Sequence, residues 1–215
     1  MPIICPAITA YSEDEYKVQI EKVVHFCQCI HIDLTDGVFT KEKTITPEQA
    51  WWPVGFKASF HLMYKNPAVA IKTILQHQPN LIIMHAEAEG NFQEMADLCH
   101  QHQVRVGLAL LESTPAEKIL PALNYVEHVL IFSGNLGYQG NSRVNLSLLE
   151  KVKLLKQHKP ELEIGWDGGV SDQNVAELIN GGVDILDVGG FIQRSDDPAR
   201  SLNMLQRIAD ETGTT

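Results

Sequence analysis

Short apolar runs alternate with helical patterns along the whole chain of 215 residues. Strand-like runs span residues 3–8, 27–34, 55–63, 80–88, 104–111, 126–134, 162–169 and 183–190. Helical patterns follow at 12–26, 66–78, 91–102, 113–123, 146–158, 171–182 and 196–211. Strands that alternate with helices predict a parallel sheet. An open doubly wound sheet and a closed (β/α)8 barrel are both compatible with this order, but eight units in one unbroken series favour the barrel, as a single domain over residues 1–215.

In barrels of this kind the reactive side chains lie at the carboxyl ends of the strands and in the loops that follow them. Polar residues and glycines gather at those ends in this sequence, whereas the opposite ends are plain. They are His31, Asp33, Asp36, His61, His85, Glu87, Glu112, Gly134, Gly137, Gly140, Asp167, Gly168, Gly169, Gly189 and Gly190. We therefore expect the functional site at the carboxyl end of the barrel.

Four of these residues form a candidate metal-binding set. His31 and Asp33 are two apart in one strand, so strand pleating points both to the same face. His61 ends the next strand and Asp167 ends the seventh. Two histidines and two carboxylates suit zinc, iron(II), manganese or cobalt. The alternative is a set of buried polar groups that satisfy one another by hydrogen bonding, but their convergence on one rim favours the metal.

Glycines form the second candidate feature. The pairs 168–169 and 189–190 follow strands 7 and 8, where barrels of this type often bind phosphate through loop N–H groups. A further pair brackets the GYQG segment 137–140 after strand 6. One such pair alone would be explained by a turn of the chain. Two pairs in register, with the third segment beside them, favour a phosphate site.

Charge and composition exclude several classes of protein. The formal net charge is −10 and no basic run occurs, which argues against a nucleic-acid partner. No stretch approaches the roughly 20 apolar residues of a membrane span. The first residues, MPIICPAITA, lack the basic and apolar regions of a signal peptide. The four cysteines are expected to be reduced thiols, so the sequence predicts a cytoplasmic protein.

Taken together, the motifs resemble the ribulose-phosphate 3-epimerase family over nearly the whole chain. HIDLTDG (31–37) is similar to the family's His-x-Asp-x-Met-Asp-Gly, and FHLM (60–63) to its His-Leu-Met. MHAEAE (84–89) is similar to His-Val-Glu-Ala, GLALLESTP (107–115) to Gly-Leu-Ala-x-x-Pro-x-Thr-Pro, and GWDGGV (165–170) to Val-Asp-Gly-Gly-Ile. The combination is far more specific than any single motif.

This resemblance implies a (β/α)8 TIM barrel of the ribulose-phosphate-binding type with one divalent metal ion per subunit. The implied metal ligands are His31, Asp33, His61 and Asp167, and the two aspartates would also be the acid–base pair. The implied substrate and phosphate contacts are His61, Gly137, Tyr138, Gln139, Gly140, Gly168, Gly169, Gly189 and Gly190. The implied partner is a small phosphorylated ketose, and members commonly form homo-oligomers.

The sequence departs from the family pattern around the substrate. Ala7 stands in place of a serine on strand 1, and Thr35 and Phe132 each replace a methionine. The loop at 40–47 differs from the family's, and Trp166 is bulkier than the usual residue before the second aspartate. The chemical centre is thus kept while the cap is changed. D-ribulose 5-phosphate is the first expected substrate, and a ketohexose 6-phosphate such as allulose 6-phosphate is the alternative.

Two other classes use the same barrel. Orotidine-phosphate decarboxylase and hexulose-phosphate synthase are similar in fold but place Asp-x-Lys-x-x-Asp on one strand, and the DLTD segment at 33–36 has no lysine. A sugar-phosphate-binding barrel without turnover is the other alternative, favoured by the changed cap. The intact set of two histidines and two aspartates argues against it.

Overall fold

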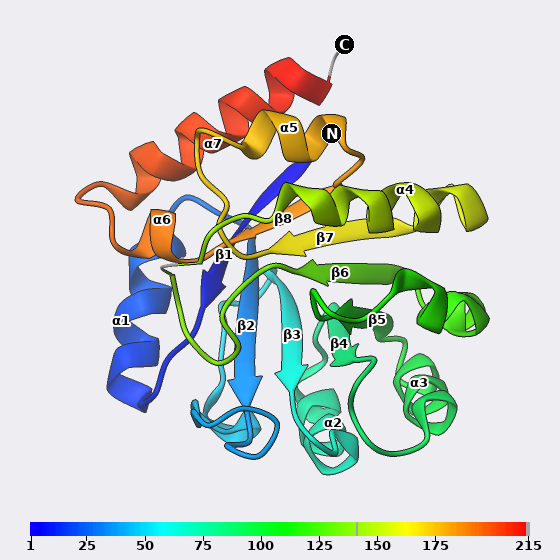
Figure 1. Ribbon diagram of the computed structural model, residues 1–215. Helices are drawn as coiled ribbons and strands as arrows, with labels where there is room; N and C mark the ends of the chain where they lie inside the picture. Colours follow the sequence, from blue (N-terminus) through cyan, green and yellow to red (C-terminus); the bar gives the residue numbers. More distant parts are fainter. Residues whose placement is uncertain (141, 214–215) are drawn as a thin grey trace.

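The computed structural model describes residues 1–140 and 142–213. Within these residues, eight parallel strands pair in chain order and close into a barrel (Figure 1). The strands are β1 (Ile3–Ile8), β2 (Cys29–Thr35), β3 (Lys57–Met63), β4 (Leu81–His85), β5 (Arg105–Leu110), β6 (His128–Phe132), β7 (Glu163–Asp167) and β8 (Ile185–Val188). The barrel predicted from the alternation of strands and helices is confirmed.

Helices cover the outside of the barrel and return the chain between strands (Figure 1). The α-helices are α1 (Glu13–Val23), α2 (Ala68–Ile74), α3 (Phe92–Gln101), α4 (Leu149–His158), α5 (Val175–Asn180), α6 (Gly190–Gln193) and α7 (Pro198–Gly213). Short 3₁₀ helices are η1 (Pro47–Gln49), η2 (Leu75–His77), η3 (Ala116–Tyr125) and η4 (Leu146–Leu148). Ser12 caps α1 as expected, because its hydroxyl accepts a hydrogen bond from the Glu15 N–H at 3.2 Å.

Two helical segments differ from the sequence prediction. The pattern at 113–123 predicts an α-helix, but the chain forms the 3₁₀ helix η3 there. Pro121 lies inside it, and proline has no N–H to continue an α-helical ladder. The four-residue helix α6 follows β8 directly, and it is too short to produce a periodic pattern in the sequence.

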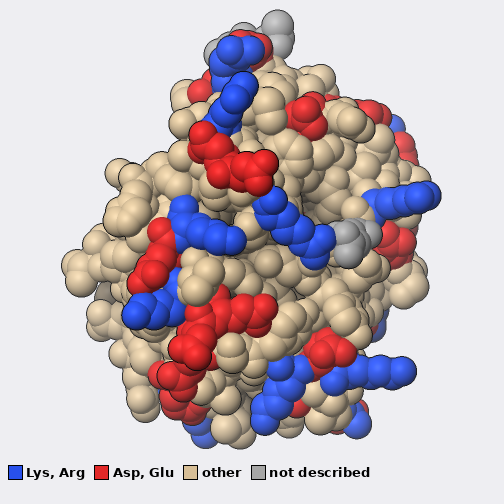
Figure 2. Space-filling view, turned by 90° about the vertical axis from the view of Figure 1, so that its left-hand side faces the viewer, with Lys and Arg blue, Asp and Glu red and all other residues tan. Residues whose placement is uncertain are grey.

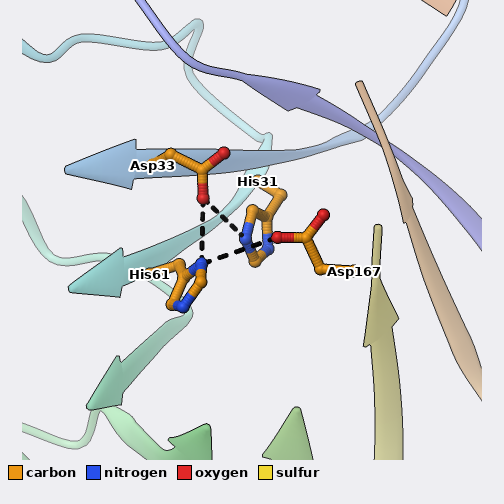
Figure 3. Close-up of side chains that lie close together, drawn as sticks. All are labelled: His31, Asp33, His61 and Asp167. Carbon is orange, nitrogen blue, oxygen red and sulfur yellow. Dashed lines mark hydrogen bonds and ion pairs between the residues drawn. The ribbon is translucent and has the colours of Figure 1, made fainter. Parts of the chain in front are cut away.

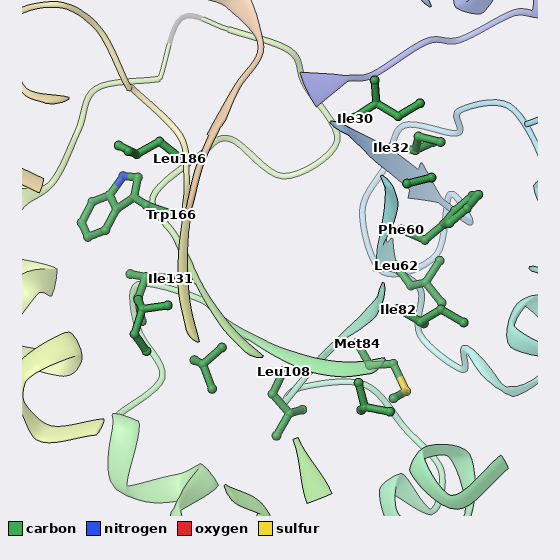
Figure 4. Close-up of a cluster of buried hydrophobic side chains, with 14 of the residues drawn as sticks. Ile30, Ile32, Phe60, Leu62, Ile82, Met84, Leu108, Ile131, Trp166 and Leu186 are labelled. Atoms are coloured by element: carbon green, nitrogen blue, oxygen red, sulfur yellow. The ribbon is translucent and has the colours of Figure 1, made fainter. Parts of the chain in front are cut away.

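The main hydrophobic core lies between the barrel and its helices. Strand residues that point outward fill this layer, including Ile30 and Ile32 of β2 and Phe60 of β3 (Figure 4). Trp166 of β7 belongs to the same layer, is fully buried, and donates from its indole Nε1 to the Gly168 carbonyl at 3.0 Å. Successive strand side chains face opposite sides, so Asp167 pointing inward turns Trp166 outward. The bulk of Trp166 therefore does not alter the substrate cap.

The inside of the barrel is divided by a small apolar plug. Leu81, Ile83, Ala109 and Leu130 form a separate buried cluster there. Polar side chains lie at the strand beginnings on one side of the plug, and the predicted functional residues lie at the strand ends on the other. The barrel thus has one end available for chemistry and another available for stability.

The surface seen in Figure 2 has mixed charge. Lys and Arg side chains are interspersed with Asp and Glu, and the described residues on this face form no continuous basic stripe. All four cysteines are free. Among the residues that the structure describes, no helix is both long and apolar enough to cross a membrane.

An ion-pair group at the strand beginnings predicts how stability depends on pH. Glu163 Oε1 lies 3.0 Å from His128 Nδ1 and 2.7 Å from Arg105 Nη2. Partial burial raises the pKa of Glu163, but His128 and Arg105 outweigh burial and lower the pKa to about 2. Because this pKa is below the ordinary value of 4.5, the unfolded chain takes up the proton first as pH falls.

We therefore expect Glu163→Gln to lower the free energy of unfolding by about 2 kcal/mol at pH 7. The difference from the wild type should shrink as pH falls from about 4.5 to about 2, because the wild-type carboxylate is then protonated as well. Urea unfolding at a series of pH values measures this difference. A difference that stays constant down to pH 2 would contradict the proposed role of the carboxylate charge.

Candidate metal centre and active site

Four side chains from three strands meet at the carboxyl end of the barrel (Figure 3). His31, Asp33, His61 and Asp167 each offer one ligand atom, and these atoms all lie within 4.8 Å of one another. Asp33 Oδ1 is 2.9 Å from His61 Nδ1 and 3.3 Å from His31 Nε2. Asp167 Oδ2 is 3.7 Å from the same His61 nitrogen. The four residues predicted as a ligand set are therefore brought together.

Strand register explains this convergence. In the β2–β3 pair, Asp33 stands directly opposite His61, while His31 lies two residues earlier on the same face. On the other side of the barrel, Asp167 stands opposite Asp187 in the β7–β8 pair. Closure of the barrel brings these two edges to face each other across the same opening.

The two aspartates have opposite electrostatic environments. Burial alone raises the pKa of Asp33, but His31 and His61 outweigh it and hold that pKa well below its usual range. Burial and the nearby charge of Asp33 raise the pKa of Asp167 well above its usual value. Burial also lowers the pKa of His61 to about 4. Asp33 is thus stabilised as a carboxylate and Asp167 as a neutral acid.

The donor set fits a divalent cation. Both ring nitrogens of the fully buried His31 have no hydrogen-bond partner among the described residues. Leaving a buried polar group unpaired costs about 1–3 kcal/mol, and a metal ion would satisfy such a nitrogen. Two imidazoles and two carboxylates suit zinc and its neighbours in the first transition row. The cluster can therefore hold one metal ion.

Sequence reasoning missed two residues that contact this cluster. Thr9 Oγ1 donates to Asp33 Oδ2 at 2.6 Å, and Asp187 Oδ1 lies 3.2 Å from His31 Nδ1. Asp187 is 3% exposed and stands two residues before the Gly189–Gly190 pair. A carboxylate inside an otherwise apolar strand was the available signal. Thr9 follows β1 without any motif and could be found only from the fold.

A cavity of about 360 Å³ opens above the cluster. Asp33 and Asp167 line it, whereas His31 and His61 are fully buried beneath. The other predicted substrate and phosphate contacts also line it: Gly137, Tyr138, Gln139, Gly140, Gly168, Gly169, Gly189 and Gly190. His61 was also expected to contact substrate, and the structure places it below the cavity wall instead, with its Nδ1 on the two aspartates.

Glycine is required where loops meet around this cavity. Gly168 has a φ of +115°, and a Cβ there would lie 2.3 Å from the Gly134 nitrogen. A Cβ on Gly169 would lie 2.3 Å from the Val144 nitrogen. These glycines therefore allow the loop after β7 to pack on the loop after β6, in addition to exposing backbone to a ligand.

The loops after β2 and β6 are joined across the opening. Tyr138 donates to Glu42 Oε1 at 2.7 Å, and Tyr11 donates to the Gly137 carbonyl at 2.8 Å. Thr35 takes part only indirectly, because its hydroxyl donates to the Glu42 carbonyl at 2.7 Å and so pins the β2 loop. It does not line the cavity, whereas the altered residues Ala7 and Phe132 do.

Comparison with known proteins supports this assignment. The model of the ribulose-phosphate 3 epimerase family matches residues 3–192. The chain belongs to the ribulose-phosphate 3-epimerase family. Among curated relatives, ribulose-phosphate 3-epimerase of Helicobacter pylori strain J99 is 28% identical, with 95% of this chain and 97% of the relative covered. The Bacillus subtilis enzyme of the same name is also 28% identical, with 83% and 85% covered. These homologues are epimerases, a class of isomerases, as the sequence resemblance implied.

Solved structures show the same fold at low sequence identity. KGPDC from Streptococcus mutans in complex with D-ribose 5-phosphate has a TM-score of 0.75 and 11% identity, with 98% of each chain covered. The 3-hexulose-6-phosphate synthase from Salmonella typhimurium has a TM-score of 0.69 and 12% identity, with 99% of this chain and 100% of that chain covered. At these identities the likeness supports the barrel type and not a shared reaction.

The cluster predicts metal-dependent stability. Zn²⁺ at about 100 times its dissociation constant should stabilise the native state by about 2.7 kcal/mol and raise the melting temperature by roughly 5 °C or more. His31→Ala and His61→Ala should lose this shift, because each removes a ligand. His100→Ala is the control, since His100 lies outside the cluster and is partly exposed. Differential scanning calorimetry with and without Zn²⁺ measures the shift, and an equal shift in all three variants would exclude this site.

Proposed function

We propose that this protein is a metal-dependent 3-epimerase that interconverts D-ribulose 5-phosphate and D-xylulose 5-phosphate. One observation carries the proposal: Asp33 of β2 and Asp167 of β7 face the same cavity directly above two buried histidines. Membership of the epimerase family and the names of the curated relatives support it. The chemistry can be followed from these two carboxyl groups.

Inversion at C3 requires one group on each face of the substrate. One aspartate removes the C3 proton as its carboxylate, which leaves an enediolate between C2 and C3. The other aspartate, as the neutral acid, delivers a proton to the opposite face of C3. In the reverse direction the roles exchange. Asp33 and Asp167 come from opposite sides of the barrel, and this separation supports their assignment to opposite faces.

One divalent metal ion per subunit is part of the proposal. Its ligands are His31, Asp33, His61 and Asp167, and zinc, iron(II), manganese and cobalt suit this set. When bound, such an ion supplies positive charge that stabilises negative charge on the substrate oxygens. Thr9 orients Asp33 through its hydroxyl, which donates to the carboxylate oxygen that faces away from His61.

The substrate phosphate is assigned to the glycine-rich loops. The N–H groups around Gly168–Gly169 and Gly189–Gly190 border the cavity on the side away from β2, and the 137–140 segment covers it. Backbone donors of this kind bind an anion without a net positive charge on the protein. A sugar phosphate in this position is in line with the structural neighbour in complex with D-ribose 5-phosphate.

The proposal extends to organisation and location. We propose that residues 1–215 form one domain, that the protein acts in the cytoplasm, and that it forms a homo-oligomer. A cytoplasmic isoform from Oryza sativa is among the curated relatives.

A ketohexose 6-phosphate is the second candidate substrate. Ala7 and Phe132 both line the cavity, so the altered cap residues act on the shape of the substrate site itself. Parallel assays with ribulose 5-phosphate and allulose 6-phosphate would decide between them. A barrel that binds either sugar without turnover would show binding but no exchange of the C3 hydrogen with solvent.

Single aspartate variants test the acid–base pair. We expect Asp33→Asn and Asp167→Asn each to lower the rate of epimerisation by about 10³-fold, because each removes one proton-transfer group. Each should still exchange the C3 hydrogen of at most one epimer in D₂O, followed by NMR, with metal content measured alongside. Asp184→Asn is the control, since Asp184 pairs with Lys156 before β8 begins. Full activity in either test variant would refute the two-aspartate mechanism.

A further inference from the structure

A line of hydrogen bonds leads from His61 away from the cavity. His61 Nε2 lies 2.8 Å from His85 Nε2 on β4, and His85 Nδ1 lies 3.2 Å from Glu87 Oε2 in the following loop. His61 is fully buried and His85 is 2% exposed. Sequence reasoning placed His85 and Glu87 at the end of a strand, but the proposed reaction uses neither of them.

The positions of the ring nitrogens determine where the protons must be. His61 Nδ1 faces Asp33 and Asp167, so it is the nitrogen available to a metal ion. A neutral imidazole that binds a metal through Nδ1 carries its only proton on Nε2. That proton is donated to His85 Nε2, which therefore accepts. The proton of His85 is then on Nδ1 and is donated to Glu87, so every contact has one donor and one acceptor.

We propose that Glu87, acting through His85, is a positioning residue that fixes the tautomer and orientation of His61 for metal binding. This inference rests on the metal centre of the proposed function and assigns a role to two residues outside it. A ligand histidine whose second nitrogen donates to a carboxylate binds metal more tightly and in one orientation. Here a second histidine is inserted between the ligand and the carboxylate.

Glu87 is itself held in place. Its Oε1 accepts from the Leu111 N–H at 3.4 Å. Lys151 of α4 fixes the same loop, because its ammonium donates to the carbonyls of Leu111 and Thr114, each at 2.8 Å. Burial tends to raise the pKa of Glu87, but His85 and Thr114 outweigh burial and the pKa is lowered. The carboxylate is therefore kept ionised and rigid.

Aromatic rings keep water from this line of hydrogen bonds. The Phe39 ring centroid lies 4.8 Å from that of His85, and the Phe132 centroid lies 5.4 Å from His61 and 5.9 Å from His85. Hydrogen bonds are stronger in such a dry environment than in water, and an unpaired partner there is costly. The fixed orientation of His61 therefore depends on all members of the line.

The first test measures Zn²⁺ affinity of the full chain by competition with a chelating dye. Glu87→Gln keeps the size of the side chain but removes the charge, and it should weaken Zn²⁺ binding about 10-fold. Glu163→Gln is a matched control, because Glu163 accepts from the buried His128 at 3.0 Å at the other end of the barrel. The control should bind Zn²⁺ as the wild type does. Equal affinities for all three proteins, or equal losses in both variants, would overturn the proposal.

The second test reads the tautomers directly and requires no variant. Long-range ¹H–¹⁵N NMR of the Zn²⁺-loaded wild type, with ¹⁵N-labelled histidine, should show His61 with its proton on Nε2 and His85 with its proton on Nδ1. In Glu87→Gln the population of this pair of tautomers should fall, which a purely structural role would not cause. A proton on Nδ1 of His61 in the Zn²⁺-loaded protein would overturn the proposal.

These outcomes are separable from failure of the proposed function. A wild type without epimerase activity whose Zn²⁺ affinity depends on Glu87 would refute the reaction and support the positioning role. An active wild type whose affinity and tautomers are unchanged in Glu87→Gln would support the reaction and refute the role. A wild type that binds no Zn²⁺ would refute the role, while activity without metal would decide the reaction.

Discussion

The pairing of β2 with β3 is the constraint on which the site depends. It sets Asp33 opposite His61, and neighbouring strands of a sheet are about 4.8 Å apart, so side chains at paired inward positions must touch. A shift of one residue would turn every inward side chain outward. The carboxylate would then enter the apolar layer around Ile32 and Phe60, at a large cost. The metal cluster and the outer core are therefore specified by one register.

Much of this arrangement was predictable from the sequence, for identifiable reasons. Periodicity indicated the strands and their order, and the two-residue spacing of His31 and Asp33 indicated a shared face. The position of polar residues at strand ends indicated His61 and Asp167 as their partners. Each inference used a rule that holds for any parallel barrel, so the closed barrel and the four-residue cluster could be expected before the structure was known.

The remaining features depend on contacts between distant segments. Thr9 meets Asp33 only because β1 pairs with β2, and Asp187 meets His31 only across the closed end of the barrel. The substitutions at Thr35 and Trp166 looked equivalent in the sequence to those at Ala7 and Phe132. In the structure, Thr35 pins a loop and Trp166 packs outside the barrel, so only the latter two shape the cavity. A family pattern shows that a residue differs but not which way its side chain points.

The metal ligands are divided unequally along the chain. His31, Asp33 and His61 lie on the second and third strands, whereas Asp167 ends the seventh. During synthesis, a growing chain therefore has three ligands long before the fourth, and the two edges that carry them meet only when the barrel closes. A metal ion held by the complete set would act as a clasp on that closure. Occupancy of the centre would thus report that folding of the nascent chain is finished, which makes the site a natural checkpoint between biosynthesis and activity.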